Sequence, residues 1–242
     1  MSCTLTIRNL ALKRGEITIA QNINLSVRHK EKIAVIGHNG SGKTTLLETI
    51  VGLNPFDRGE IELFHEKLTD KNDFANARKD IGYLLQDSDD HFLLPIARDD
   101  IAFSLLSCGE NAEIAAEKTE KIMRDLNIAK LADKIVYNLS GGEKKLVALA
   151  GILVRDPKLL LLDEPTSTLD YAAQIALARI LRDLRVSMVI VSHDRLFLEE
   201  IASDFYMIDK NGLKKIADFE SFITHSHDNL PTHTHPKNPP AI

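Results

Sequence analysis

Eight consecutive residues constrain the fold of this chain more than any other feature. Segment 37–44 reads Gly-His-Asn-Gly-Ser-Gly-Lys-Thr and fits the pattern G-x-x-x-x-G-K-[ST] at every fixed position. An apolar stretch typical of a buried strand precedes it at 32–36, and a helical periodicity follows it. Glycines in such a turn let backbone N–H groups face a phosphate at the start of the helix. The pattern predicts a phosphate-binding loop between a strand and a helix.

The loop predicts a nucleotide ligand without choosing a reaction. Lys43 is placed to reach the β- and γ-phosphates, and Thr44 to put its hydroxyl on Mg²⁺. Kinases and GTPases share the loop, so a further feature must decide between ATP hydrolysis and other chemistry. The residues expected to bind the nucleotide here are Gly37, His38, Asn39, Gly40, Ser41, Gly42, Lys43 and Thr44.

Two acids follow the most apolar segment of the chain, four leucines at 159–162. Asp163, at the tip of a buried strand, is predicted to hold Mg²⁺ opposite Thr44. Glu164 then lies beside the γ-phosphate, where a carboxylate can polarise an attacking water as general base. The alternative is a pair of solvated acids at the end of a strand. The preceding leucines and the phosphate loop favour the catalytic interpretation.

A second helix start suited to a phosphate occurs at Leu-Ser-Gly-Gly-Glu, residues 139–143. Ser140 is placed to cap the helix, and the glycines after it let the backbone approach another group closely. One nucleotide cannot use both helix starts of a single chain without remote folding. The economical arrangement is a head-to-tail dimer, in which the loop of one chain and segment 139–143 of the other close on the same ATP.

These segments resemble the motifs of the ABC ATPase family over nearly the whole chain. The family order is present: the phosphate loop, a glutamine after a strand, Leu-Ser-Gly-Gly-Glu, Leu-Leu-Leu-Leu-Asp-Glu-Pro at 159–165, Ser-Thr-Leu-Asp at 167–170, and a late histidine. The resemblance implies that Gln86 touches Mg²⁺ and the attacking water and couples the site to the helical insertion. It also implies contacts to the γ-phosphate across the dimer from Ser140 and Gly142, and it places Gly141 among the nucleotide-binding residues. The implied Mg²⁺ ligands are Thr44, Gln86 and Asp163.

Two further motif residues and three departures complete the resemblance. Asp170 resembles the family's cross-dimer aspartate, and His193 would hydrogen-bond the γ-phosphate and hold the transition-state geometry. Arg14 lies near the place where the family commonly stacks an aromatic residue on adenine, which predicts poor selectivity for the base. Leu146 stands where the family usually has arginine, and Glu143 where glutamine is commoner. The implied catalytic residues are Glu164, His193 and Gln86.

Periodicity along the rest of the chain predicts an α/β fold. Alternating or β-rich stretches between residues 4 and 36 indicate an antiparallel β-subdomain, and strand–helix alternation after about 157 indicates a parallel sheet. We predict a P-loop NTPase core, a mostly parallel sheet flanked by helices, with that β-subdomain and an inserted helical subdomain at about 87–155. The ATPase domain is predicted to span 1–224, followed by a flexible His- and Pro-rich tail at 225–242.

The composition of the chain indicates which classes of partner and which cell location to expect. The net charge is −5, and the sequence has no basic stripe, so nucleic acid is not an expected partner. The apolar runs are far shorter than the ~20 residues that span a bilayer. Two distant cysteines make no disulfide framework, and the N-terminus alternates like a strand, not like a signal peptide. We expect a cytoplasmic protein, peripheral to the inner face of the cell membrane.

Segments 85–92, 99–103 and 147–151, with Pro95, resemble the cobalt/nickel and vitamin importers of the energy-coupling-factor type. The resemblance implies a second ATPase subunit, identical or paralogous, and a transmembrane coupling protein whose helices dock in a groove formed after Gln86. The other function kept open is a soluble ABC ATPase of translation or DNA repair. A single phosphate loop and the lack of a long coiled coil speak against it.

The transported substrate is the least constrained feature. Two His-x-His pairs in the tail are suited to Ni²⁺ or Co²⁺, since neutral imidazole binds such borderline metals. A polar tail with accidental histidines is an equal alternative, and a vitamin or other cargo stays open. The candidate tail ligands are His225, His227, His233 and His235.

Overall fold

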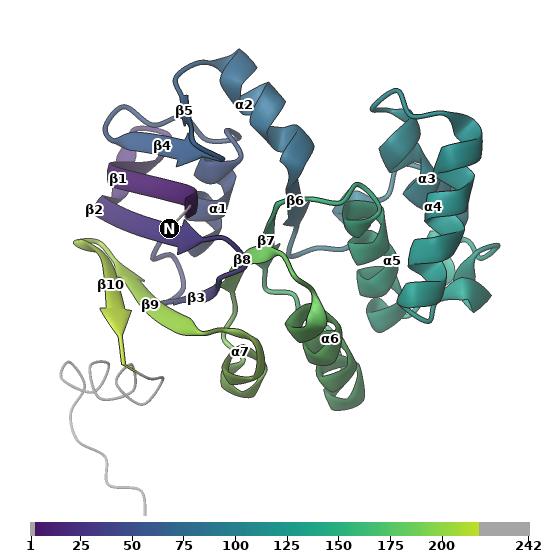
Figure 1. Ribbon diagram of the computed structural model, residues 1–242. Coiled ribbons are helices and arrows are strands. Elements are labelled where there is room, and N and C mark those ends of the chain that lie inside the picture. The colour runs from purple at the N-terminus through teal and green to yellow at the C-terminus, as the bar shows by residue number, and fades with distance from the viewer. Residues whose placement is uncertain (1–2, 218–242) are drawn as a thin grey trace, which may run out of the picture.

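The computed structural model describes residues 3–217, and within them the strands form two sheets (Figure 1). The smaller sheet is antiparallel, in the order β2-β1-β4-β5, and a long hairpin of β1 and β2 dominates it. Its strands are β1 (Cys3–Arg14), β2 (Ile17–Arg28), β4 (Glu60–Leu63) and β5 (Glu66–Leu68).

The larger sheet has the order β10-β9-β3-β8-β7-β6 and is parallel except at β10. Strand β8 therefore lies between β3, which leads into the phosphate loop, and β7, which ends at Asp163. The strands are β3 (Lys32–Ile36), β6 (Ile81–Leu84), β7 (Leu159–Asp163), β8 (Ser187–Val191), β9 (Asp204–Asp209) and β10 (Gly212–Ile216).

Both faces of the central strands are buried, because successive side chains of a strand point to opposite faces. Ile33 and Val35 face one apolar core, shared with α1 and the antiparallel sheet, while Ala34 and Ile36 face the other. The leucines of β7 divide in the same way. The long helices are α1 (Lys43–Ile50), α2 (Lys71–Ala77), α3 (Ala97–Leu106), α4 (Ala112–Asp125), α5 (Gly141–Leu153), α6 (Tyr171–Asp183) and α7 (Arg195–Ile201).

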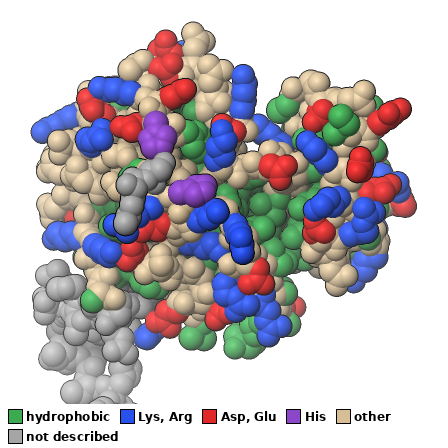
Figure 2. Space-filling view, viewed as in Figure 1, with side chains coloured by type: hydrophobic (Ala, Val, Ile, Leu, Met, Phe, Trp, Pro, Cys, Tyr) green, Lys and Arg blue, Asp and Glu red, His purple; other side chains and the backbone are tan. Residues whose placement is uncertain are grey.

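Helices α3, α4 and α5 form a lobe to one side of the large sheet, with α6 and α7 below it (Figure 1). In the space-filling view a hollow separates this lobe from the rest of the molecule, and hydrophobic side chains line it (Figure 2). Gly82 of β6 allows α5 to pack closely, since a Cβ there would lie 2.2 Å from Cγ2 of Ile152. Within residues 3–217, no helix has the length and apolar character needed to cross a membrane.

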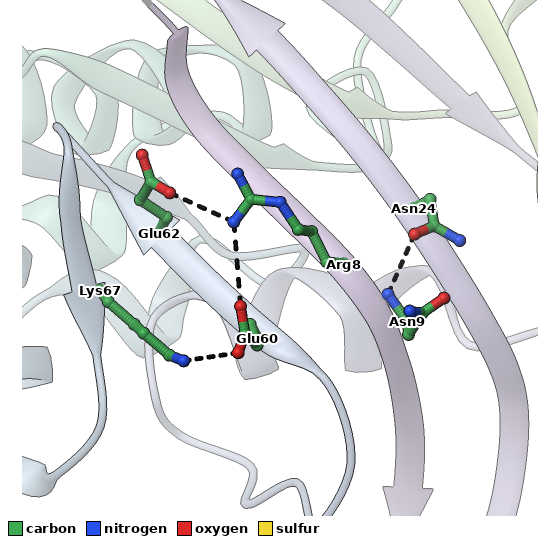
Figure 3. A network of polar contacts seen from close by, with 6 residues as sticks. All are labelled: Arg8, Asn9, Asn24, Glu60, Glu62 and Lys67. Carbon is green, nitrogen blue, oxygen red and sulfur yellow. Dashed lines mark hydrogen bonds and ion pairs between the residues drawn. The ribbon is translucent and has the colours of Figure 1, made fainter.

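Polar side chains cover the outer face of the antiparallel sheet (Figure 3). Arg8 of β1 lies between two acids of β4, with its Nη1 3.3 Å from Oε2 of Glu62 and 3.8 Å from Oε2 of Glu60. Lys67 of β5 reaches the other oxygen of Glu60 at 2.5 Å. These exposed pairs contribute little stability. They make this face of the sheet polar, while the opposite face packs on α1.

The predicted fold class is confirmed, and the differences are local. Several of the β-rich stretches predicted between residues 4 and 36 join into one continuous strand, β2, which has register shifts against β1. The structure adds β5, α2 and β10, which were not predicted. Most of 87–96 is irregular, with a short 3₁₀ turn at Asp89–His91 where helix was predicted. The boundaries at 87–155 and 1–224 stay predictions, and the four tail histidines lie outside the described residues.

Candidate nucleotide-binding and catalytic site

The phosphate loop is held in a form that only glycine suits at two positions. Gly42, which precedes α1, has a φ of 101°, a left-handed value that disfavours side chains. A Cβ on Gly37 would lie 2.7 Å from the carbonyl oxygen of Ile208 in the neighbouring strand. No side chain caps α1 within the described part of the chain. The first-turn N–H groups of α1 are therefore left for another acceptor.

Lys43 folds its side chain back over the loop. Its Nζ donates to the carbonyl oxygens of Gly37 at 2.8 Å and of His38 at 3.1 Å. Burial lowers the pKa of this amine, and the charges of Glu164 and Asp163 oppose that shift. Ser41 closes the loop, since its N–H donates to the His38 carbonyl at 3.1 Å. A cation is thus fixed at the start of α1.

Asp163 ends β7 directly beside the loop and is 1% exposed. Burial raises the pKa of this carboxyl, and a hydrogen bond with Thr44 opposes the rise. Among the described residues, nothing hydrogen-bonds its Oδ1 atom. An unpaired buried carboxylate oxygen is costly unless it meets a cation. Hard oxygen donors beside a threonine hydroxyl are the ligands that Mg²⁺ prefers, so the residues fit this ion.

Glu164 follows at φ 43°, in the left-handed region, where a residue other than glycine is strained. Its N–H donates to the carbonyl of Val191 at 2.8 Å, which ties the turn to the end of β8. Its Oε2 accepts from the backbone N–H of His193 at 3.2 Å, and Nε2 of His193 lies 3.4 Å from Oε1. Two neighbouring strand ends therefore aim an acid and a histidine at the same space.

Most of the predicted residues meet at one open cavity of about 540 Å³. Gln86 reaches it from the loop after β6, and Arg14 and Ile19 reach it from the β1–β2 hairpin. The predicted residues that line it are Arg14, Asn39, Gly40, Gly42, Lys43, Thr44, Gln86, Asp163, Glu164 and His193. Gly37, His38 and Ser41 belong to the turn that supports it.

Side chains of the segment 139–143 bond two of the segment's own N–H groups, those of Ser140 and Glu143. Oγ of Ser140 accepts from the N–H of Glu143 at 3.3 Å, and Oε2 of Glu143 accepts from the N–H of Ser140 at 3.0 Å. This capping box begins α5. Asp170 likewise caps α6, accepting from the N–H of Ala173 at 2.8 Å. Ser140, Gly142 and Asp170 are outside the lining of the 540 Å³ cavity in the described chain.

Gly141, unlike Ser140 and Gly142, lines a cavity that adjoins the phosphate loop. This cavity has a volume of about 600 Å³, and its wall also includes Thr44, Gln86 and Asp163. A Cβ on Gly141 would lie 3.2 Å from the carbonyl oxygen of Thr168, in the turn that leads to α6. The start of α5 therefore faces the turn before Asp170 within one chain.

The sequence profile of the ABC transporter family matches residues 20–167, a segment that runs from β2 past the acids of β7. The match contains the phosphate loop, segment 139–143 and both acids. The chain belongs to the ABC transporter family. Its members of this type hydrolyse ATP, and this chain is such an ATPase subunit.

Two relatives show the level of sequence identity between this ABC protein and other ATP-binding subunits. An uncharacterized ABC transporter ATP-binding protein of Haemophilus influenzae is 40% identical over 200 residues, which cover 83% of this chain and 92% of that protein. The energy-coupling factor transporter ATP-binding protein EcfA of Methanoculleus marisnigri is 35% identical over 201 residues, covering 81% and 72% of the two chains.

Two solved structures share the fold of this ABC protein. The protein cbiO1 of Clostridium perfringens, part of the ABC transporter complex cbiONQ, has a TM-score of 0.83 at 24% identity and covers 94% and 93% of the two chains. The ATP-binding cassette MJ0796, solved as a dimer in a post-hydrolysis state with ADP and Pi, has a TM-score of 0.78 at 24% identity and covers 89% and 100%.

Sequence reasoning missed Lys145, a residue of this ABC protein that contacts the backbone of Gln86. It is 1% exposed, and its Nζ donates to the Gln86 carbonyl at 2.9 Å. A signal was present, because Lys145 shares a helix face with Ala148 and Leu149, which are both buried. A lysine on an apolar face at helical spacing is unusual and requires a partner.

Proposed function

We propose that this ATPase subunit energises the import of a small substrate by a transporter of the energy-coupling-factor type. It would work as a dimer with a second ATPase subunit and bind a transmembrane coupling protein from the cytoplasmic side. The observation that carries the catalytic part is the meeting of Asp163, Glu164 and His193 at the carboxyl ends of β7 and β8, beside the phosphate loop.

In the proposed reaction, each side chain has one task. The loop N–H groups and Lys43 bind the triphosphate, and Thr44, Asp163 and Gln86 would hold Mg²⁺. When bound, that ion supplies positive charge that neutralises the phosphate oxygens. Glu164 accepts the proton of the attacking water as general base. His193, which lies against Glu164, orients that carboxylate and donates to the γ-phosphate.

Dimer formation would supply the remaining wall of the pocket. Ser140 and Gly142 lie outside the cavity of their own chain, and the adjoining cavity leaves room near the Mg²⁺ site. A second copy or a paralogue would present its α5 start and its Asp170 to the bound ATP. The dimeric form of the cassette MJ0796 supports this arrangement.

The coupling protein would dock beside the segment that follows Gln86. A cavity of about 290 Å³ lies there between β6, α3 and α5. Its wall mixes apolar with charged groups, including Leu53, Tyr83 and Ile152 next to Asp100 and Arg155. Such a mixed concave surface suits a short amphipathic helix. The similarity to EcfA and to cbiO1, part of a transporter complex, supports a partner of this kind.

For the cargo, we propose a transition-metal ion, nickel or cobalt, with a vitamin as the alternative. The support is the sequence of the tail and the similarity to the energy-coupling-factor type. Titrating the full chain and a chain that ends at Thr224 with Ni²⁺ tests the role of the tail histidines. Equal affinities would remove the argument for a metal.

The replacement Glu164→Gln tests the catalytic part. The amide oxygen still accepts from the His193 N–H, but it takes up no proton. We expect normal ATP binding, turnover slower by ~10²–10⁴-fold, and accumulation of an ATP-bound dimer. Turnover and sedimentation of the full chain measure these effects. Glu199→Gln, on the exposed side of α7, is the matched control for lost charge. Near-normal turnover of the Glu164 variant would reject this residue as the base.

A further inference from the structure

Lys145 of α5 is a fully buried lysine whose ammonium group donates hydrogen bonds to backbone carbonyls. Its Nζ donates to the carbonyl oxygens of Gln86 at 2.9 Å and of Leu85 at 3.4 Å. Both carbonyls belong to the loop that leaves β6 for the nucleotide cavity. Burial lowers the pKa of this amine, while the charges of Asp87 and Asp163 oppose the shift. The ammonium is therefore placed where backbone dipoles and acids compensate it.

Other contacts hold the same short loop. The N–H of Leu85 donates to Nε2 of His91 at 2.8 Å, so the peptide groups around Leu85 are held on two sides. Oγ of Ser167, next to the acids of β7, donates to the Gln86 carbonyl at 3.4 Å. Lys144 adds an ion pair with Asp89 at 2.7 Å. The segment after β6 is thus attached to the first turns of α5.

These contacts join two parts of the proposed machinery that are distant in the sequence. Helix α5 starts at Gly141, directly after its cap Ser140, the residue proposed to meet the partner's ATP, and Lys145 lies in its second turn. Gln86 lines the nucleotide cavity of its own chain. A shift of α5 would move the Lys145 ammonium, and with it the Gln86 backbone, because a buried ammonium cannot leave its acceptors without a large desolvation cost.

We propose that Lys145 is a positioning residue for ATP hydrolysis: it fixes the Gln86 backbone to α5, so that the Gln86 side chain is placed correctly only when α5 is docked. The inference rests on the proposed function, in which Gln86 acts at the nucleotide. Lys145 itself touches neither nucleotide nor metal. The Lys145 contact differs from a general stabilising contact, since both acceptors of the ammonium are carbonyls of the loop that carries Gln86.

The test compares Lys145→Met with Lys121→Met in the full chain. Methionine keeps much of the length and apolar volume of lysine and removes the donors, and Lys121 is exposed on α4 of the same lobe. We expect Lys145→Met to lower kcat by about 10–100-fold, because small misplacements of catalytic groups cost that much. The KM for ATP and the equilibrium affinity for ATP should stay within about 2-fold of the parent, since the phosphate loop is intact. Lys121→Met should leave kcat unchanged.

Backbone amide exchange at 85–92, compared with exchange in α1, separates a local loosening of this segment from a loss of overall stability. We expect faster exchange there in Lys145→Met and unchanged exchange in α1. A kcat close to that of the parent overturns the proposal, as does a parallel loss of ATP affinity with a lower Tm. Failure of this inference is distinct from failure of the proposed function, because in the latter case Glu164→Gln also leaves turnover unchanged.

Discussion

Helices α1 and α5 both begin where a phosphate is expected, but their N-termini differ in whether a side chain caps them. Helix α1 follows Gly42, and within the described chain no side chain caps it. Helix α5 is closed by the capping box of Ser140 and Glu143. The start of α1 therefore offers its N–H groups to an anion as folded. The start of α5 already bonds the N–H groups of Ser140 and Glu143 to its own side chains, so in the proposed dimer only its other first-turn N–H groups would be open to a partner's phosphate.

The same contrast extends to charge. Lys43 provides a positive charge at the start of α1. Glu143 provides a negative charge at the start of α5, where its pKa is lowered chiefly by the hydrogen bond from the Ser140 N–H. Negative charge stabilises a helix start but repels a phosphate. The first end is thus suited to tight phosphate binding, and the second, in the proposed dimer, would contact phosphate only on the partner subunit.

The largest effect is expected at α1, from Lys43→Met. Loss of the ammonium removes charge-assisted hydrogen bonds to the phosphates, which should weaken ATP binding by about 10²-fold. Isothermal titration with ATP and Mg²⁺ measures it. Lys79→Met, which removes an exposed charge outside both helix starts, is the control. An affinity within about 3-fold of the parent would show that Lys43 does not make the start of α1 a stronger phosphate site than the start of α5.

A smaller effect is expected at α5, from Ser140→Ala. Loss of the cap should cost about 1 kcal/mol of stability, and turnover should fall by about 10-fold while ATP binding to the single chain is unchanged. Urea unfolding and turnover at several protein concentrations separate the two effects. Asn111→Ala is the matched control, since Asn111 caps α4 by accepting from the Glu113 N–H at 2.7 Å. Equal turnover losses in both variants would show that Ser140 acts only as a helix cap and has no role at the nucleotide.

The smallest effect is expected from Glu143→Gln, which keeps the capping box but removes its charge. Glutamine still accepts the Ser140 N–H, but a neutral amide accepts more weakly than the carboxylate and loses the favourable charge at the helix start, so stability should fall by about 0.5 kcal/mol. ATP-dependent dimerisation should strengthen up to about 5-fold, because less negative charge meets the partner's phosphates. Sedimentation at two salt concentrations measures this, and the gain should shrink at high salt. Weaker dimerisation would contradict the charge argument.

Short sequence patterns predicted those parts of the site that lie within single segments of the chain. The phosphate loop, the buried strand before it and the acids after four leucines all follow from short stretches of sequence. Helix α2 escaped prediction because it buries no residue fully and shows no apolar face. Strands β5 and β10 are short edge strands rich in charged residues. Their existence depends on β4 and β9 offering open edges, which no local pattern reports.

Other features arise only from tertiary contacts. The strained φ of Glu164 depends on its bond to the end of β8, and β8 is far away in the sequence. The burial of Lys145 depends on the carbonyls of Leu85 and Gln86, which become acceptors only when α5 packs on β6. The family motifs named Gln86 but could not predict what holds its backbone.

The strand order β3-β8-β7 has a consequence for the protein during its synthesis. The phosphate loop leaves the ribosome early, and the acids that complete it come more than a hundred residues later. Even then β7 reaches β3 only through β8, which is made after β7, and such long-range pairings form slowly. The phosphate loop and the two acids therefore cannot come together before β8 has been made and paired with both neighbouring strands. The order of the strands along the chain thus delays assembly of the ATPase site until its late strands have been made.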